Sequence, residues 1–226
     1  LIATADGCLA RHGERVILYT AGKAPRSLEF KSTAQLIGAG GDYLHVVTGD
    51  ELLLFDSAGA FVASDERVDG VSSITAVKGP EQQDLLAVGF EDGVVELSSL
   101  QSGEMGIRNT LQGCPNSPVS LLMAGPPGSI IVGFEDGSIG LWGLRDGLQI
   151  RTTRLHGAIR HGVLRDGQLT AATDLGEVLA WNLSPFYTPA CDLLQHVWQE
   201  VPVTWQRGQA IRQDPPAQHP CFPEEK

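Results

Sequence analysis

Several features that would point to a membrane protein or a nucleic-acid-binding protein are absent from this sequence. No apolar run approaches the roughly 20 residues that span a bilayer, so we expect a soluble chain with no membrane partner. The 16 basic residues are outnumbered by 27 acidic ones, and the resulting net charge of −11 disfavours nucleic acid as a partner. No signal peptide is visible; the chain starts at Leu1 inside a strand-like run, so we expect its beginning to be missing.

Cysteine is scarce, and the spacing of the cysteines does not indicate a metal site. The sequence has 4 cysteines and no C-x-x-C pair: Cys8, Cys114, Cys191 and Cys221. This spacing fits neither a zinc site nor a compact disulfide framework. We therefore expect reduced, mostly structural thiols, no bound metal and a cytoplasmic location.

Catalytic motifs are missing as well. The sequence has no G-x-S-x-G elbow, no H-E-x-x-H motif and no phosphate-binding loop. His45 and His161 are flanked by strand-like residues, which favours half-buried or surface histidines over metal ligands. We predict that the chain is not an enzyme and binds no cofactor.

What the sequence does contain is a repeat. The hexapeptide Val-Gly-Phe-Glu-Asp-Gly occurs at Val88–Gly93 and again at Val132–Gly137. A third, weaker copy places Gly176 after a similar apolar run, and two more copies lie upstream, around Cys8–Tyr19 and Tyr43–Phe55. The repeat period of roughly 40 residues is typical of a stacked repeat architecture.

Each copy predicts a β-hairpin. The pairs Asp92-Gly93 and Asp136-Gly137 stand between alternating apolar runs, where a tight turn needs a positive φ. The acidic pairs lack the further oxygen donors of a calcium loop, so we interpret them as scaffold. Further apolar runs flank the hairpins: Ile74–Val77, Val119–Met123 and Ala158–Leu164 before them, and Leu28–Phe30, Phe61–Ala63 and Leu148–Thr153 after them.

Four antiparallel strands repeated in this way predict an all-β fold, a β-propeller with about five blades over residues 1–183. The second run of each hairpin ends in a column of mostly aromatic residues: Tyr19, Phe55, Ser98, Trp142 and Trp181. Together with Asp92, Gly93, Asp136, Gly137 and Gly176, the aromatic members of this column are the predicted structural positions of the repeat.

These units resemble the tryptophan–aspartate (WD) repeat family, in a divergent, bacterial-type form. The best unit runs from Leu111-Gln112-Gly113 through the Asp136-Gly137 turn to Leu141-Trp142. The namesake aspartate is replaced by Gly143 after one tryptophan and by Asn182 after the other. The resemblance implies a non-catalytic scaffold that binds protein partners.

Two other functions remain open. One is a sensor or regulatory domain of a larger multidomain enzyme, such as a bacterial serine/threonine kinase. The other is a ligand- or cofactor-binding propeller enzyme of the quinoprotein-like kind. A candidate docking patch for an acidic partner is formed by Arg151, Arg154 and Arg160, although such charge runs are more often solvated surface.

Residues 184–226 break the pattern. Thr188-Pro189 predicts a helix start, and the apolar residues that follow are spaced as on one face of a helix that ends before Pro202. We expect this short helix to pack on or near the last blade, followed by a short strand at Val203–Gln206 and an extended tail. Trp205 is a candidate for the outer strand of the last blade.

Overall fold

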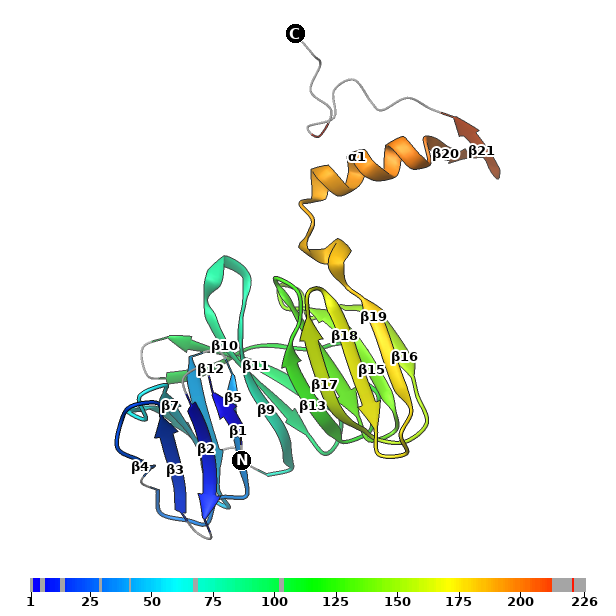
Figure 1. The fold of residues 1–226 in the computed structure, drawn as a ribbon. Helices are drawn as coiled ribbons and strands as arrows, with labels where there is room; N and C mark the ends of the chain where they lie inside the picture. Colours follow the sequence, from blue (N-terminus) through cyan, green and yellow to red (C-terminus); the bar gives the residue numbers. More distant parts are fainter. Residues whose placement is uncertain are drawn as a thin grey trace.

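The computed structural model describes residues 2–4, 7–12, 15–28, 30–40, 42–66, 69–101, 104–212 and 221. In these residues the chain forms five successive antiparallel sheets, followed by one helix and a small hairpin (Figure 1). We number the sheets as blades 1 to 5 in chain order. None of the described helices is long and apolar enough to span a membrane.

Every blade is a simple meander in which consecutive strands are neighbours. The strands of blades 1 and 2 are β1 (Ile2–Thr4), β2 (Gly7–His12), β3 (Arg15–Thr20), β4 (Arg26–Leu28), β5 (Leu36–Gly40), β6 (Tyr43–Val47), β7 (Leu52–Asp56) and β8 (Phe61–Asp65). Those of blades 3 to 5 are β9 (Val71–Lys78), β10 (Asp84–Phe90), β11 (Val95–Gln101), β12 (Glu104–Thr110), β13 (Val119–Ala124), β14 (Ser129–Phe134), β15 (Ser138–Gly143), β16 (Gln149–Arg154), β17 (Ile159–Arg165), β18 (Gln168–Thr173) and β19 (Val178–Asn182). A single 3₁₀ turn, η1 (Pro80–Gln82), joins β9 to β10.

The first strands of the blades lie side by side and hold the blades in sequence. Strand β5 contacts both β1 and β9, and β13 contacts both β9 and β17. In the described residues the first and last blades do not pack against each other as neighbouring blades do. The predicted all-β propeller of about five blades is confirmed as an arc of five blades.

The core lies between the blades, because each sheet buries both faces only where it has a neighbour. Between blades 3 and 4, for example, Leu97 and Val132 belong to one buried cluster and are fully shielded from solvent. Three similar clusters fill the junctions between blades 1 and 2, 2 and 3, and 4 and 5. A fully buried aliphatic side chain contributes about 1.5–3 kcal/mol, so these junctions carry most of the stability of the arc.

Among the described residues, blade 5 differs from the other blades in having three strands. After β19 the chain turns through η2 (Ser184–Tyr187) into α1 (Ala190–Glu200). The predicted strand at Val203–Gln206 is confirmed as β20, which pairs with β21 (Gln209–Arg212). Trp205 therefore lies in a separate hairpin and not in the outer strand of blade 5.

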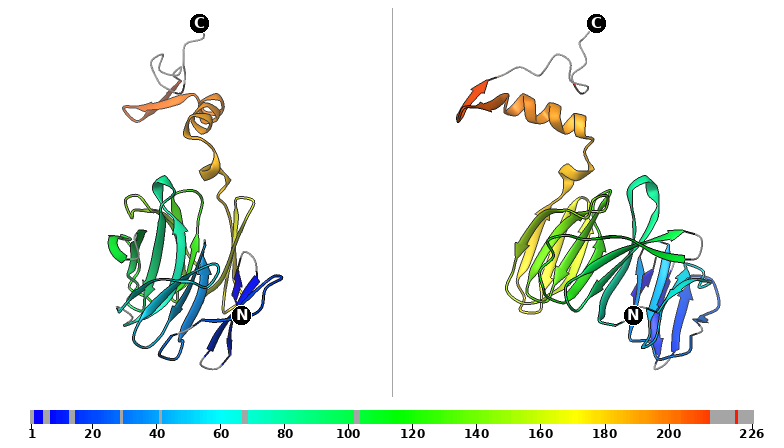
Figure 2. Two further views of the ribbon diagram at one scale, coloured as in Figure 1. Left: turned by 90° about the vertical axis from the view of Figure 1, so that its left-hand side faces the viewer. Right: turned by 180° about the vertical axis from the view of Figure 1, so that it is seen from behind.

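The helix differs from the prediction in its position. Figures 1 and 2 show α1 standing away from the sheets, and none of its residues is buried. The physical reason is the path of η2, which carries the chain off the end of the last blade before the helix begins. The helix starts at Ala190 with Pro189 as its N-cap, one residue later than Thr188-Pro189 predicted.

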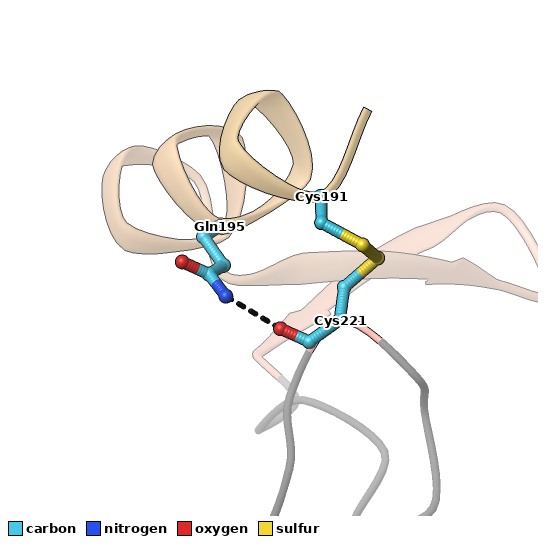
Figure 3. Close-up of a disulfide and its surroundings, with 3 residues drawn as sticks. All are labelled: Cys191, Gln195 and Cys221. Carbon is cyan, nitrogen blue, oxygen red and sulfur yellow. Dashed lines mark hydrogen bonds between the residues drawn. A yellow bond between two sulfur atoms is a disulfide. The ribbon is translucent and has the colours of Figure 1, made fainter. Parts of the chain in front are cut away.

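The tail also corrects the prediction of reduced thiols. Cys191 in the first turn of α1 forms a disulfide with Cys221, and the Gln195 side-chain amide donates a hydrogen bond of 2.6 Å to the Cys221 carbonyl (Figure 3). The two cysteines are 30 residues apart in sequence, so only the fold of the tail brings them together. Cys8 and Cys114 are free thiols, and burial raises the pKa of Cys114 to about 11.

Candidate functional site

The repeated acidic residues lie in the turns between the second and third strands of the blades, at an end of the arc that we call the turn face. Asp92 accepts a hydrogen bond of 3.0 Å from the backbone N–H of Val94. Asp136 accepts one of 2.9 Å from the backbone N–H of Ser138 and another of 3.1 Å from its hydroxyl. Both carboxylates therefore stabilise their own turns, as the scaffold interpretation requires.

The glycines after these acids have a second role. Gly93 and Gly137 have φ values of 90° and 88°, which disfavour any side chain. A Cβ atom there would also lie 2.1 Å from the carbonyl oxygen of Pro115 or Leu155, in the loop that enters the next blade. Gly176 has a similar φ of 82° but nothing near its Cβ direction. The turns of blades 3 and 4 are thus packed against the following blade, whereas that of blade 5 is open.

The aromatic column lies on the third strands, where it faces the preceding blade. Trp142 is completely buried, lies edge-on to Phe134 at a centroid distance of 6.0 Å, and donates a hydrogen bond of 2.8 Å to the Gln112 carbonyl. Phe55 and Trp181 are also buried.

Tyr19 belongs to the same column but is 36% exposed. It pairs across the hairpin with Cys8, just as Trp142 pairs with Ile130. Leu9 and Leu18, on the other face of blade 1, are buried against blade 2. Tyr19 therefore points to the side where the described structure has no preceding blade, which explains its exposure.

The three predicted arginines lie on strands of blades 4 and 5, but they do not form a uniformly basic patch. Arg154 donates to the Asp136 carbonyl at 3.0 Å and lies 3.4 Å from its carboxylate. Arg160 donates to Glu135 at 3.2 Å and lies 3.9 Å from Asp174. The acids of the turns thus balance these two arginines.

Arg151 has a different environment. Its guanidinium lies 4.9 Å from the centre of the Trp181 ring, in a cation–π contact. In the part of the chain that the structure describes, it makes no ion pair with an acid. Of the three predicted residues, Arg151 is the one for which the described residues provide no acid within ion-pair distance.

A shallow hollow of about 450 Å³ opens beside the arginine–acid pairs on the turn face. It is lined by Asp136, Arg154, Leu155, His156 and Gly157. His156 is also tied to blade 5, because its backbone N–H donates a hydrogen bond of 2.6 Å to the Glu177 carboxylate. The hollow is therefore built from the turn of blade 4 and from the loop between blades 4 and 5.

The opposite end of the arc carries a second hollow, of about 330 Å³. Its walls come from the loops between the first and second strands of blades 3 and 4 and from the start of the tail: Ala76, Val77, Lys78, Gly79, Gln82, Ala124, Gly125, Pro126, Pro127, Gly128, Ser129 and Tyr187. Lys78 is the only ionised side chain in this wall, and its ammonium is held 2.5 Å from Asp84. This hollow is mostly backbone and apolar surface.

Asp84 also links two blades. The Tyr43 hydroxyl in blade 2 donates to the Asp84 carboxylate at 3.1 Å. Burial and the neighbouring Asp84 charge raise the pKa of Tyr43, and the hydrogen bond to Asp84 raises the pKa of Lys78. These shifted groups hold the scaffold together and do not converge on a cavity.

His45 is more deeply buried than its strand-like flanks predicted. It is 1% exposed, it lies over Gly38, and it faces blade 3. Burial lowers its pKa to about 3, and its Nδ1 atom has no hydrogen-bond partner. One residue of the sequence bears on this burial: Gly38, which pairs with His45 across the two strands and has no side chain to occupy the space of the imidazole ring. In the described residues, no three His, Cys, Asp or Glu side chains are placed to hold a metal.

Comparison with known proteins identifies the fold. No family model matches the chain, and neither does any curated protein sequence. Among solved structures, a chain of the mitotic checkpoint complex is 16% identical with a TM-score of 0.63, covering 78% of this chain and 57% of that one. The WD40 β-propeller domain of Doa1 is 16% identical with a TM-score of 0.58, covering 76% and 60%.

A computationally designed protein, Ika4, is also similar, at 17% identity and a TM-score of 0.53. The match covers 69% of this chain and 94% of Ika4. The chain thus spans less than two thirds of the two natural structures, and the similarities are of fold alone. That fold is the WD40 type of β-propeller.

Proposed function

We propose that these propeller blades form a non-catalytic platform that binds a protein partner through the turn face of blades 4 and 5. One observation carries the proposal: charged side chains from three separate segments meet there. They are the turn of blade 4 with Glu135 and Asp136, the end of β16 with Arg154, and the first strand of blade 5 with Arg160.

These ion pairs add little to folding. The side chains of Arg154 and Arg160 are 69% and 45% exposed, and exposed pairs contribute only about 0–1 kcal/mol. Arginine is nevertheless enriched in protein interfaces, where its stem packs and its fork donates in fixed geometry. Side chains that stabilise the fold weakly, on a rigid frame beside a hollow, suit recognition better than structure.

The shifted titratable groups support a non-catalytic role. His45 lies inside the junction of blades 2 and 3, Cys114 packs against the core of blades 3 and 4, and Tyr43 lies at the opposite end of the arc from the turn face. A catalytic site brings such groups together in one cavity. Each of these groups instead lies at a separate packing position.

The partner is expected to carry both charges, because the cluster presents two arginines and three carboxylates. The regulatory role in a larger enzyme and the quinoprotein-like activity raised by the sequence stay predictions, as does the cytoplasmic location.

The test is a quantitative pull-down that compares the wild-type chain with Arg160→Glu and Arg154→Glu. We expect each reversal to reduce capture of the specific partner at least about fivefold, the effect of losing a charge pair at an interface. Arg26→Glu is the matched control, since Arg26 is an exposed arginine on blade 1 that donates to a backbone carbonyl. If all three variants capture the partner as well as wild type does, the turn face is not the binding surface.

A further inference from the structure

The hollow of about 330 Å³ at the end of the arc opposite the turn face is built by two neighbouring blades. The first strands of blades 3 and 4, β9 and β13, contribute Ala76, Val77 and Ala124 to its wall. The loops after these strands supply most of the rest, together with Tyr187 at the end of η2. Both blades have a neighbouring blade on each side, so this hollow lies inside the arc and not at its ends.

Tyr187 links this hollow to another at the same end of the arc. The other hollow has a volume of about 340 Å³ and is lined by Asp166, Gly167, Ser184 and Tyr187. Tyr187 belongs to both walls and is 48% exposed. The two hollows thus share one exposed aromatic residue, which gives an extended peptide segment two adjacent places for its side chains.

The wall of the hollow between blades 3 and 4 favours a compact apolar group. Pro126 and Pro127 present pyrrolidine rings beside the aromatic ring of Tyr187. Aromatic and small apolar residues together make the kind of surface on which proline-containing segments dock in the polyproline II conformation. Such segments are extended before they bind, so binding costs them little conformational entropy. A proline ring is therefore a suitable occupant of this hollow.

The rim of this hollow is acidic. The ammonium of Lys78 lies 2.5 Å from the Asp84 carboxylate and 3.7 Å from that of Asp42, so its charge is already balanced. Glu81, in the same loop, is exposed and makes no ion pair among the described residues. Three carboxylates thus surround one ammonium. A ligand with arginine or lysine next to its proline complements this rim, whereas an acidic ligand is repelled.

The backbone of the loop between β9 and β10 is strained at the same place. Glu81 and Gln82 have φ values of 60° and 61°, in the left-handed region that favours glycine. Two consecutive residues with side chains are uncommon there, and such strain is concentrated in segments that bind ligands. The backbone N–H of Gly79 donates to the Gln83 carbonyl at 2.8 Å, which closes the loop. The strain therefore coincides with the acidic rim of the hollow.

We propose that these two hollows bind an extended segment of a protein partner that contains proline and a neighbouring arginine or lysine. The proline occupies the hollow between blades 3 and 4, beside Tyr187, and the basic residue meets the carboxylates of Glu81 and Asp42. This inference goes beyond the proposed function, because it assigns a second binding surface at the end of the arc opposite the turn face.

Two segments of this chain fit the hollows less well than a separate partner does. Residues 213–220 contain three prolines, but their one residue charged at neutral pH is Asp214, which the acidic rim repels. The run Lys23-Ala24-Pro25-Arg26 has the right composition, but it belongs to a closed turn. The backbone N–H of Lys23 donates to the Thr20 carbonyl at 3.1 Å, and Arg26 donates to the Ala58 carbonyl at 2.9 Å.

The test is an NMR titration of the chain with a synthetic peptide of sequence Ala-Pro-Pro-Val-Pro-Arg-Arg. One control peptide has glutamate in place of both arginines, and the other has alanine in place of the prolines. We expect the amide signals of Gly79, Gly128 and Tyr187 to shift, and each control to bind at least about fivefold more weakly. Equal affinity of either control, shifts confined to the turn face, or no binding at millimolar concentration overturns the proposal.

Substitutions of exposed residues sharpen the result. Glu81→Lys should weaken binding of the arginine peptide at least about fivefold and strengthen binding of the glutamate peptide. Glu91→Lys is the matched control, because it makes the same charge change at the other end of β10, and it should leave the affinity unchanged. Tyr187→Ala should also weaken binding, and Tyr187→Phe should restore it. If Glu81→Lys has no more effect than Glu91→Lys, the proposal is wrong.

Spectra of the free chain at two protein concentrations test whether a second copy occupies the hollows. A concentration-dependent shift at Gly79 and Gly128 would show that it does and would overturn the proposal. The two proposals remain separable, because the pull-down depends on Arg154 and Arg160 at the other end of the arc. A failed titration with an intact pull-down response would reject the hollows alone, and the reverse would reject the turn face alone.

Discussion

Blades 4 and 5 share a strand order and a repeat, yet they differ in what covers them. Ile131 and Leu141, on the face that blade 4 turns to blade 5, are completely buried. The corresponding residues of blade 5, Thr170 and Ala180, are exposed. The last blade keeps the large apolar residues on its inner face and has smaller ones on its outer face. The comparison shows that a neighbouring blade, more than the strand pattern itself, decides how much of each blade is buried.

Substitutions at the two tryptophans should give the largest difference in the free energy of unfolding between blades 4 and 5. Trp142→Ala should lower the free energy of unfolding by about 3–5 kcal/mol, because it opens a fully enclosed cavity and leaves the Gln112 carbonyl without its donor. Trp181→Ala should cost less, about 2 kcal/mol, since solvent and Arg151 border its site. Urea unfolding followed by circular dichroism measures both. Equal losses would contradict the comparison.

The burial of His45 between blades 2 and 3 should make the stability of the chain depend on pH. His45 is neutral in the folded chain with a pKa of about 3, so below its unfolded pKa of about 6.5 the unfolded state binds more protons. Stability should be complete above that value and fall by about 1.4 kcal/mol per pH unit as the pH drops toward 3. His45→Leu should remove this part of the slope in urea unfolding between pH 6 and pH 4.

Thr170→Val is the control for this measurement, since Thr170 lies on the exposed face of blade 5 and the substitution adds or removes no titratable group. It should leave the pH slope of the wild type unchanged. If His45→Leu keeps the wild-type slope too, His45 is not the group that couples the junction to pH.

Substitutions at the turn glycines should give a smaller difference in the free energy of unfolding between blades 4 and 5. Gly137→Ala combines a positive φ with a clash against the Leu155 carbonyl, and we expect a loss of about 2 kcal/mol or more. Gly176→Ala keeps the unfavourable φ but meets open space, so about 1 kcal/mol is expected. Thermal melting of both variants measures the difference, and a larger loss at Gly176 would reverse the interpretation.

The smallest effect on the blades should come from the tail. Cys191→Ser removes the disulfide but touches no junction, so the free energy of unfolding of the blades in urea should stay within about 0.5 kcal/mol of wild type. An eleven-residue helix is marginal alone, and trypsin should cut faster at Arg207 and Arg212 once the link is lost. A clear fall in this free energy would show that the tail does support the blades.

Much of the fold could be predicted because the signals are local. The Asp136-Gly137 turn needs a positive φ whatever surrounds it, and β14 and β15 follow from the apolar runs on either side. The column from Tyr19 to Trp181 identified equivalent positions, although the exposure of Tyr19 depends on a neighbour and not on the pattern. The Cys191–Cys221 link, the place of α1 and the pairing of Trp205 could not be predicted, because each joins segments that no local rule connects.

In the candidate site, too, local features could be predicted from the sequence and contacts between distant segments could not. Arg151, Arg154 and Arg160 could be singled out as a run of positive charge, but the acids that balance two of them come from other segments. The sequence by itself determined the repeat, the strands and their turns, since backbone geometry and alternating burial are encoded residue by residue. Only the tertiary structure decided which faces of the described blades are covered and which of the three arginines meet acids, because these depend on the packing of whole blades.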